Sequence, residues 1–175
     1  MPTSTYKSLV EASSRLANID FLGVNKRSIS NARSLLEHAG PDLRSAEALL
    51  QFKPNVPVEY NKSFFPTHID DIRHLERLGV ALRLAGDTAA HDQDFASVAR
   101  YGMLILQLAN TVRRGGLVVD HLVSYGIVGV GIECLRPVRH RYDEHILRHL
   151  IADLVLYEHG REGLTEIVRR ALAQD

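Results

Sequence analysis

Apolar side chains recur every three to four residues along most of this 175-residue chain, which is the spacing of one face of an α-helix. Glycine, proline and capping side chains interrupt the pattern, as they do at helix ends. The clearest stops are Gly40-Pro41, Gly86-Asp87, Arg113–Gly116 and Gly160. The pattern predicts an all-α fold, an irregular bundle of seven to eight helices. The predicted helices cover residues 6–17, 41–50, 67–86, 117–136 and 164–172, and three more that begin at Ser28 or Ser30, at Asp92 or Asp94, and at Tyr142 or Asp143 and end at Gly40, Arg113 and Gly160.

The helical pattern is lost between Gln51 and Pro66, where three prolines remove backbone donors and predict a long loop or an edge-strand-like segment. Four of the eleven aromatic residues of the chain lie in this loop: Phe52, Tyr60, Phe64 and Phe65. A solvated linker would not concentrate aromatic side chains. They form either a contact surface for a partner or a lid over the core. Because the preceding 50 residues are few for an independent core, we expect one domain over residues 1–175.

The most apolar segment follows Gly116 and is apolar on both flanks, which predicts a central, buried helix packed on two sides. It is long enough to span a bilayer. However, it contains Asp120 and Glu133, and each acid would cost roughly 2.5–3.5 kcal/mol at the bilayer centre. We therefore expect no membrane span.

Two acids of this segment, Asp120 and Glu133, are candidate buried acids. A buried carboxylate must be paired, hydrogen-bonded or protonated, and such groups occur both in active sites and as structural anchors. Arg113, Arg114 and His121 are the local candidate partners of Asp120. A structural anchor is the interpretation that we favour.

His145, His149 and Asp153 follow one another at intervals of four residues and would share one side of one helix. Two histidines at this spacing can chelate a metal such as zinc. The alternative is a solvated face on which Asp153 pairs with His149. The sequence indicates no third ligand from another segment, and no cofactor is predicted.

The amino-acid composition limits the classes of protein to which the chain can belong. Lys plus Arg number 21 and Asp plus Glu number 21, so the basic excess of nucleic-acid-binding proteins is missing. The single cysteine excludes an internal disulfide framework. The N-terminus lacks a basic region followed by an apolar one, so we expect a cytoplasmic protein. Glycine-rich phosphate loops, nucleophile elbows and zinc-type cysteine patterns are absent from the sequence.

The hairpin predicted between Leu78 and Val98 resembles a tetratricopeptide repeat (TPR). The resemblance rests on Leu78-Gly79, Leu82, Gly86-Asp87, Phe95 and Val98. It implies a close antiparallel helix pair, with His91 in the place of a small residue and no closing proline. A second copy at the repeat period is missing, so the resemblance covers one hairpin. Residues 72–135 also resemble uncharacterised bacterial helical proteins, which implies no activity.

These observations favour a protein- or peptide-interaction module without catalysis, with the Gln51–Pro66 aromatics as the first candidate surface and a homo-oligomer as one possibility. The alternative hypothesis is a metal-dependent or small-ligand-binding enzyme that uses His, Asp and Glu side chains around the central helix.

Overall fold

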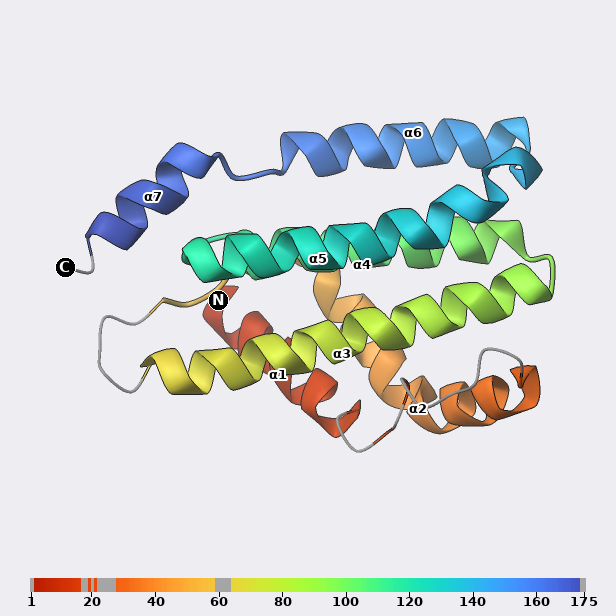
Figure 1. Ribbon diagram of the computed structural model, residues 1–175, viewed down its shortest axis with the longest axis horizontal. Coiled ribbons are helices and arrows are strands. Elements are labelled where there is room, and N and C mark those ends of the chain that lie inside the picture. The colour runs from red at the N-terminus through yellow and green to blue at the C-terminus, as the bar shows by residue number, and fades with distance from the viewer. Residues whose placement is uncertain (1, 17–18, 20, 22–27, 59–63, 174–175) are drawn as a thin grey trace.

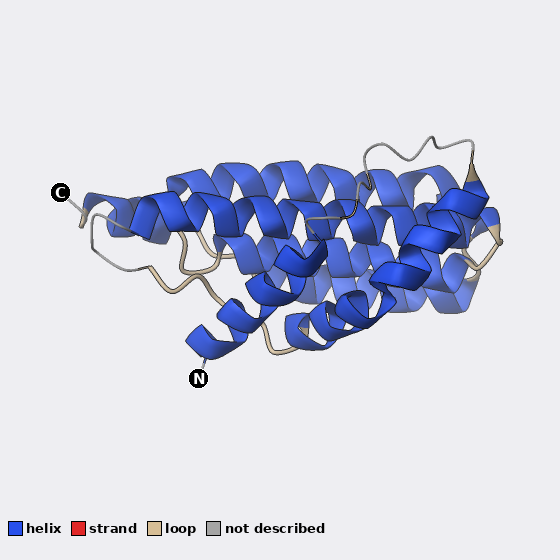
Figure 2. Cartoon of the chain, turned by 90° about the horizontal axis from the view of Figure 1, so that it is seen from below, coloured by secondary structure: helices blue, strands red, loops and turns tan. Residues whose placement is uncertain are grey.

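A computed structural model describes residues 2–16, 19, 21, 28–58 and 64–173 of the chain. These residues form helices and connecting loops, with no strand among them (Figures 1 and 2), so the all-α prediction is confirmed. The elements are α1 (Pro2–Arg15), α2 (Ile29–Leu50), α3 (Phe64–His91), α4 (Phe95–Arg113), α5 (Val118–Leu135), the 3-10 helix η2 (Arg136–Arg141), α6 (Glu144–His159) and α7 (Leu164–Leu172).

Helix α4 is the centre of the bundle. It packs against α2, α3, α5 and α6. Its side chains are buried almost without interruption from Val98 to Arg113, including Ile105 and Leu108, which are fully buried. The main core lies between α4 and α3, where Leu75, Leu78 and Leu82 are also inaccessible.

Helix α5 is not the central buried helix that the sequence predicted. Only one strip of it is buried, and this strip carries small and polar residues, while Leu122 and Tyr125 face outward with 64% and 51% of their surfaces exposed. The small residues turn inward because they allow close packing: a Cβ added at Gly131 would lie 2.9 Å from Leu106 Cδ2. The buried strip consists of Asp120, His121, Ser124, Ile127, Gly131 and Cys134.

Helix α2 runs through Gly40-Pro41, which the sequence analysis took as the boundary between two helices. The ribbon changes direction near its middle (Figure 1). A proline inside a helix removes one hydrogen bond and bends the helix without having to end it. Ala39, Leu43 and Ala46 are buried on both sides of the proline, so packing holds the two halves in one element.

Helix α3 starts earlier and ends later than predicted. It starts at Phe64 rather than after Pro66, because proline is tolerated in a first turn whose backbone donors have no helical acceptor. It also continues through Gly86 to His91. A Cβ at Gly86 would lie 2.5 Å from Cys134 Sγ, so this glycine allows α5 to approach and is not a stop signal.

Other end signals are confirmed. Asp94 caps α4 by accepting a hydrogen bond from the Ser97 backbone N–H at 3.1 Å. Asp143 caps α6 in the same way through Ile146 N at 2.8 Å. Gly115 follows α4 with a φ of +74°, a conformation that favours glycine. These turns place α5 and α6 on the outside of α4 (Figure 1).

Candidate functional site

The aromatic residues of the Gln51–Pro66 loop divide into two groups. Phe52 and Phe65 are on the surface, 74% and 52% exposed. Phe64 is half-buried and its ring stacks on His68, with 4.8 Å between the ring centroids. Tyr60 lies outside the described residues. The four predicted contact residues are therefore not shown to form one surface.

The first part of this loop is fixed to the turn between α4 and α5. The Val56 N–H donates to the Arg114 carbonyl oxygen at 2.8 Å, and Arg114 Nη1 donates to the Lys53 carbonyl oxygen at 2.9 Å. Val56 is buried in the core. Residues 53–56 thus pack against the core, while the choice between a contact surface and a lid for the four aromatic residues stays a prediction.

Asp120 is completely buried and pairs with a residue that the sequence did not suggest. Its Oδ1 lies 2.6 Å from His68 Nε2 of α3, and its Oδ2 accepts a hydrogen bond from the Leu117 N–H at 2.6 Å. The three local candidate partners were wrong. Asp120 thereby joins α3 to the first turn of α5. The positive end of the helix dipole at this turn also stabilises a carboxylate.

A cavity of about 160 Å³ lies beside this pair, lined among others by Tyr6, Lys7, His68 and Asp71. The Tyr6 hydroxyl and His68 Nδ1 are buried and have no hydrogen-bond partner among the described residues. Burial raises the pKa of Tyr6 above its ordinary value, with Asp71 and Asp120 adding to the shift, and burial also raises the pKa of Asp71. Both hydroxyl and imidazole nitrogen are therefore free to bind a water or a small polar molecule.

Glu133 is not a buried acid. Its side chain is 66% exposed and lies 3.4 Å from Arg83 Nη1, while Arg83 makes a shorter contact of 2.8 Å with Asp87. The prediction was wrong because Glu133 lies on the outward side of α5, and the sequence does not show which side of a helix apolar on both flanks faces the core. Asp120 and Glu133 are not brought together.

The structure brings two of the three predicted metal ligands together. His145 Nε2 and His149 Nε2 are 3.2 Å apart, and their ring centroids are 4.4 Å apart. They line, with Asp153, a groove of about 400 Å³ between α4 and α6 that reaches the end of α2. Within the described ranges, no group of three or more His, Cys, Asp or Glu side chains could hold a metal ion.

A concentration of exposed apolar side chains on the last three α-helices was missed from the sequence. Of the fourteen large apolar side chains that are strongly exposed in the described part of the chain, twelve belong to α5, α6 and α7. We call these twelve the C-terminal apolar surface. Its members are Val118, Leu122, Tyr125, Ile132, Leu147, Ile151, Leu154, Val155, Leu156, Leu164, Val168 and Leu172.

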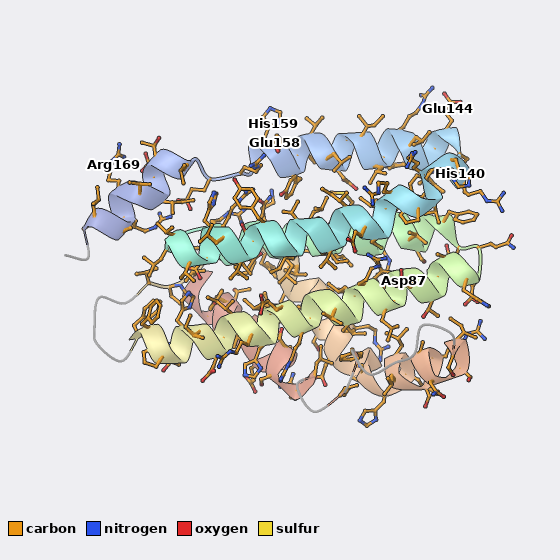
Figure 3. The ribbon with its side chains drawn as sticks, in the orientation of Figure 1. Asp87, His140, Glu144, Glu158, His159 and Arg169 are labelled. Carbon is orange, nitrogen blue, oxygen red and sulfur yellow. The ribbon has the colours of Figure 1, made fainter. Side chains whose placement is uncertain are left out.

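Charged side chains project from the same helices. Figure 3 shows Glu144, Glu158 and His159 on α6 and Arg169 on α7. Within the apolar stripe of α7, Ile167 is buried, whereas Leu164, Val168 and Leu172 are exposed.

The segment Val118–Arg141 is long and apolar enough to cross a membrane by length and composition, and 33% of its most apolar window is buried inside the protein. The rest of that window is half-buried or exposed. One such helix is weak support for a membrane span, since core helices of soluble proteins pass the same test.

Comparison with known proteins adds no assignment: no protein family, no curated protein and no solved structure matches the chain.

Proposed function

We propose that the protein is a protein-interaction module that docks through the C-terminal apolar surface, and that its partner is a second copy of the chain. The observation that carries the proposal is the concentration of twelve of the fourteen strongly exposed large apolar side chains on α5–α7. Soluble monomers rarely expose apolar patches beyond a few hundred Å². A surface of this kind is stable in water when something covers it.

The size of the surface fits a dimer interface. Each exposed side chain presents about 80 Å² of apolar area, and burial of that area is worth about 2 kcal/mol. The twelve side chains together present on the order of 1,000 Å². A stable interface buries about 800 Å² on each partner. The formal charge of zero means that two copies do not repel each other. A two-fold axis would pair the surface with itself.

The experiment compares the molar mass of three proteins by light scattering after gel filtration. The wild type is expected to be a dimer. The double substitution Leu122→Asp and Ile151→Asp, at two exposed positions of the surface, is expected to give a monomer with unchanged helical circular dichroism. The matched control, Phe52→Asp with Phe65→Asp, changes the other two strongly exposed apolar side chains and is expected to stay dimeric.

Three results would contradict the proposal. A wild type that remains monomeric at 100 µM would remove the second copy as partner. A dimer that dissociates with the Phe52 and Phe65 substitutions but not with those at Leu122 and Ile151 would move the interface to the proline loop. Co-sedimentation of the wild type with neutral lipid vesicles would contradict a protein partner and favour a bilayer.

The TPR-like hairpin remains part of this proposal as the scaffold of the module. The packing of α3 against α4 and α5 supports it, and a Cβ added at Gly79 would make ordinary contacts of 3.7 Å with Leu108 of α4 and 3.9 Å with Ile127 of α5. In this view α3 and α4 form the rigid pair on which α5 and α6 are displayed. We also propose a cytoplasmic location.

A second candidate function is supported by the Tyr6–His68 cavity. Its two buried, unpartnered polar atoms favour a small ligand that both donates and accepts hydrogen bonds. A ligand-observed NMR screen of small polar metabolites tests it, with Tyr6→Phe as the variant that keeps the ring and removes the hydroxyl. A hit whose signal is unchanged by Tyr6→Phe would count against this cavity.

A further inference from the structure

The pair His145 and His149 has the geometry of a chelate. The residues are one turn apart on α6, and each points its Nε2 at the other, 3.2 Å away. Two nitrogens bound at about 2.0–2.1 Å to one tetrahedral zinc ion lie about 3.3–3.4 Å apart. The two nitrogens share a hydrogen bond at 3.2 Å, which is close to this separation, so small ring rotations bring both nitrogens to face one ion in its place.

The position of the pair allows an ion to reach it. Both side chains are exposed, and they line the groove of about 400 Å³ between α4 and α6. The groove is also lined by Gln51, Gln107 and Asp153. An ion held by two imidazoles would keep its remaining coordination positions open on this side.

We propose that His145 and His149 together bind one divalent transition-metal ion of the zinc type at this groove. The two imidazoles are the protein ligands, and water fills the other positions, because no group of three or more ligating side chains surrounds one point in the described ranges. Imidazole nitrogen suits zinc, nickel and copper and does not suit magnesium or calcium. This site is independent of the C-terminal apolar surface.

The site would also fix α6. Apart from Leu150, which is buried, and the half-buried Ile146 and Tyr157, this helix is exposed along its length. A metal that bridges two consecutive turns adds a constraint to a helix that few core contacts hold. Binding that occurs only in the folded state raises the free energy of unfolding.

Two other potential zinc ligands are buried and do not compete. The single cysteine, Cys134, is buried, and burial raises the pKa of its thiol to about 11, so it does not supply a thiolate near neutral pH. His68 is fully buried against Asp120. His140 and His159, at the two ends of the α6 region (Figure 3), serve as controls that are exposed and on the same part of the chain.

The test titrates the full chain, without an affinity tag, with zinc chloride in an isothermal calorimeter. The wild type is expected to bind one zinc ion per chain. His145→Ala and His149→Ala are each expected to weaken binding at least tenfold, and His140→Ala and His159→Ala to leave it unchanged. All four positions are exposed, so the variants are expected to fold, which circular dichroism checks.

Three results would overturn the proposal. One is a wild-type titration that is indistinguishable from that of the His145→Ala, His149→Ala double variant. Another is a loss of binding in either control variant, which would place the ion elsewhere. The third is a tenfold loss in Asp153→Asn, because a carboxylate would then be a ligand and the two-histidine site would be the wrong assignment.

Discussion

Helices α1–α4 and helices α5–α7 contain similar apolar residues, but the two groups bury these side chains to different extents. In α3 and α4 the large apolar side chains are buried, as Leu75, Leu78 and Leu108 show with no exposed surface. In α6 only Leu150 is buried, while Ile151 and Leu156 are exposed by 60% and 66%. The difference teaches that apolar periodicity locates helices, whereas the number of neighbours decides whether an apolar face becomes core or surface.

The cause lies in α4. Because this helix is already covered by α2, α3, α5 and α6, the two outer helices pack against it with one face each. Nothing in the described part of the chain covers their other apolar side chains. In the described part of the chain, most of the large apolar side chains of α3 and α4 are thus covered within the fold, and many of those of the outer helices are not.

The largest loss of stability is expected when the buried pair of His68 and Asp120, which joins the two regions, is broken. Asp120→Ala removes one partner of the buried pair with His68 and should lower the free energy of unfolding by about 3–5 kcal/mol. Urea denaturation followed by circular dichroism measures it. Glu133→Ala, the exposed acid of the same helix, should change stability by less than about 0.5 kcal/mol. Equal effects of the two substitutions would contradict the account.

A second prediction compares leucines of the two regions. Leu108→Ala in the core should cost about 2–5 kcal/mol, because it leaves a cavity in a fully buried site. Leu172→Ala, 69% exposed at the end of α7, should change the stability of the monomer by less than about 0.5 kcal/mol. Urea unfolding at low protein concentration separates the two. A large cost at Leu172 in the monomer would mean that α7 is packed more tightly than we describe.

Two glycines give a third contrast, because substitution by alanine is expected to lower the stability at one and to raise it at the other. A Cβ at Gly102 would lie 2.5 Å from Leu135 Cγ, so Gly102→Ala should destabilise the protein by about 1–3 kcal/mol. Nothing lies within 4 Å of a Cβ at Gly126 on the outward side of α5. Gly126→Ala should therefore stabilise the monomer by about 0.5–1 kcal/mol through helix propensity. Thermal unfolding measures the change in stability of each variant. If both substitutions changed stability in the same direction, the description of Gly102 as closely packed and Gly126 as open would be wrong.

The smallest effect concerns the attachment of α7. Glu162 lies between Arg170, at 2.7 and 2.8 Å, and the Gly115 N–H, at 3.0 Å. Burial alone would raise the pKa of Glu162, but these donors outweigh it and hold the pKa below its ordinary value. The ion pair therefore stabilises the fold above the ordinary glutamate pKa of 4.5, and this contribution is lost as the pH falls through the lowered value.

Accordingly, Glu162→Gln should lower stability by up to about 1 kcal/mol at pH 7. The difference from the wild type should shrink on acidification below pH 4.5. Glu166→Gln, which breaks the exposed pair with Arg169 one turn away, is the control with little expected effect. A difference that grows in acid would contradict the sign of the pKa shift.

Local signals in the sequence predicted the helices well and their environments poorly. The caps Asp94 and Asp143 act within four residues, so the sequence contains all that determines them. Pro41 and Gly86 were misinterpreted as stops because packing against distant helices holds α2 and α3 together there. The partner of Asp120 is 52 residues away, and no local pattern indicates it.

The same limit applies to the candidate site. The four-residue spacing of His145 and His149 was sufficient to predict their proximity. The C-terminal apolar surface was not predictable from the sequence. A helix buried on two sides has the same pattern of apolar residues as a helix that is buried on one side and exposes its other apolar side. Ile132 of α5 illustrates it: the sequence placed it in the interior, and 48% of its surface is exposed.

The most direct test of the central claim is the mass of the native wild-type assembly, measured by native mass spectrometry or sedimentation equilibrium across a hundredfold range of concentration. The account predicts a species of twice the chain mass of 19.6 kDa, which dissociates on dilution. A single species of 19.6 kDa at every concentration would show that the C-terminal apolar surface does not bind a second copy.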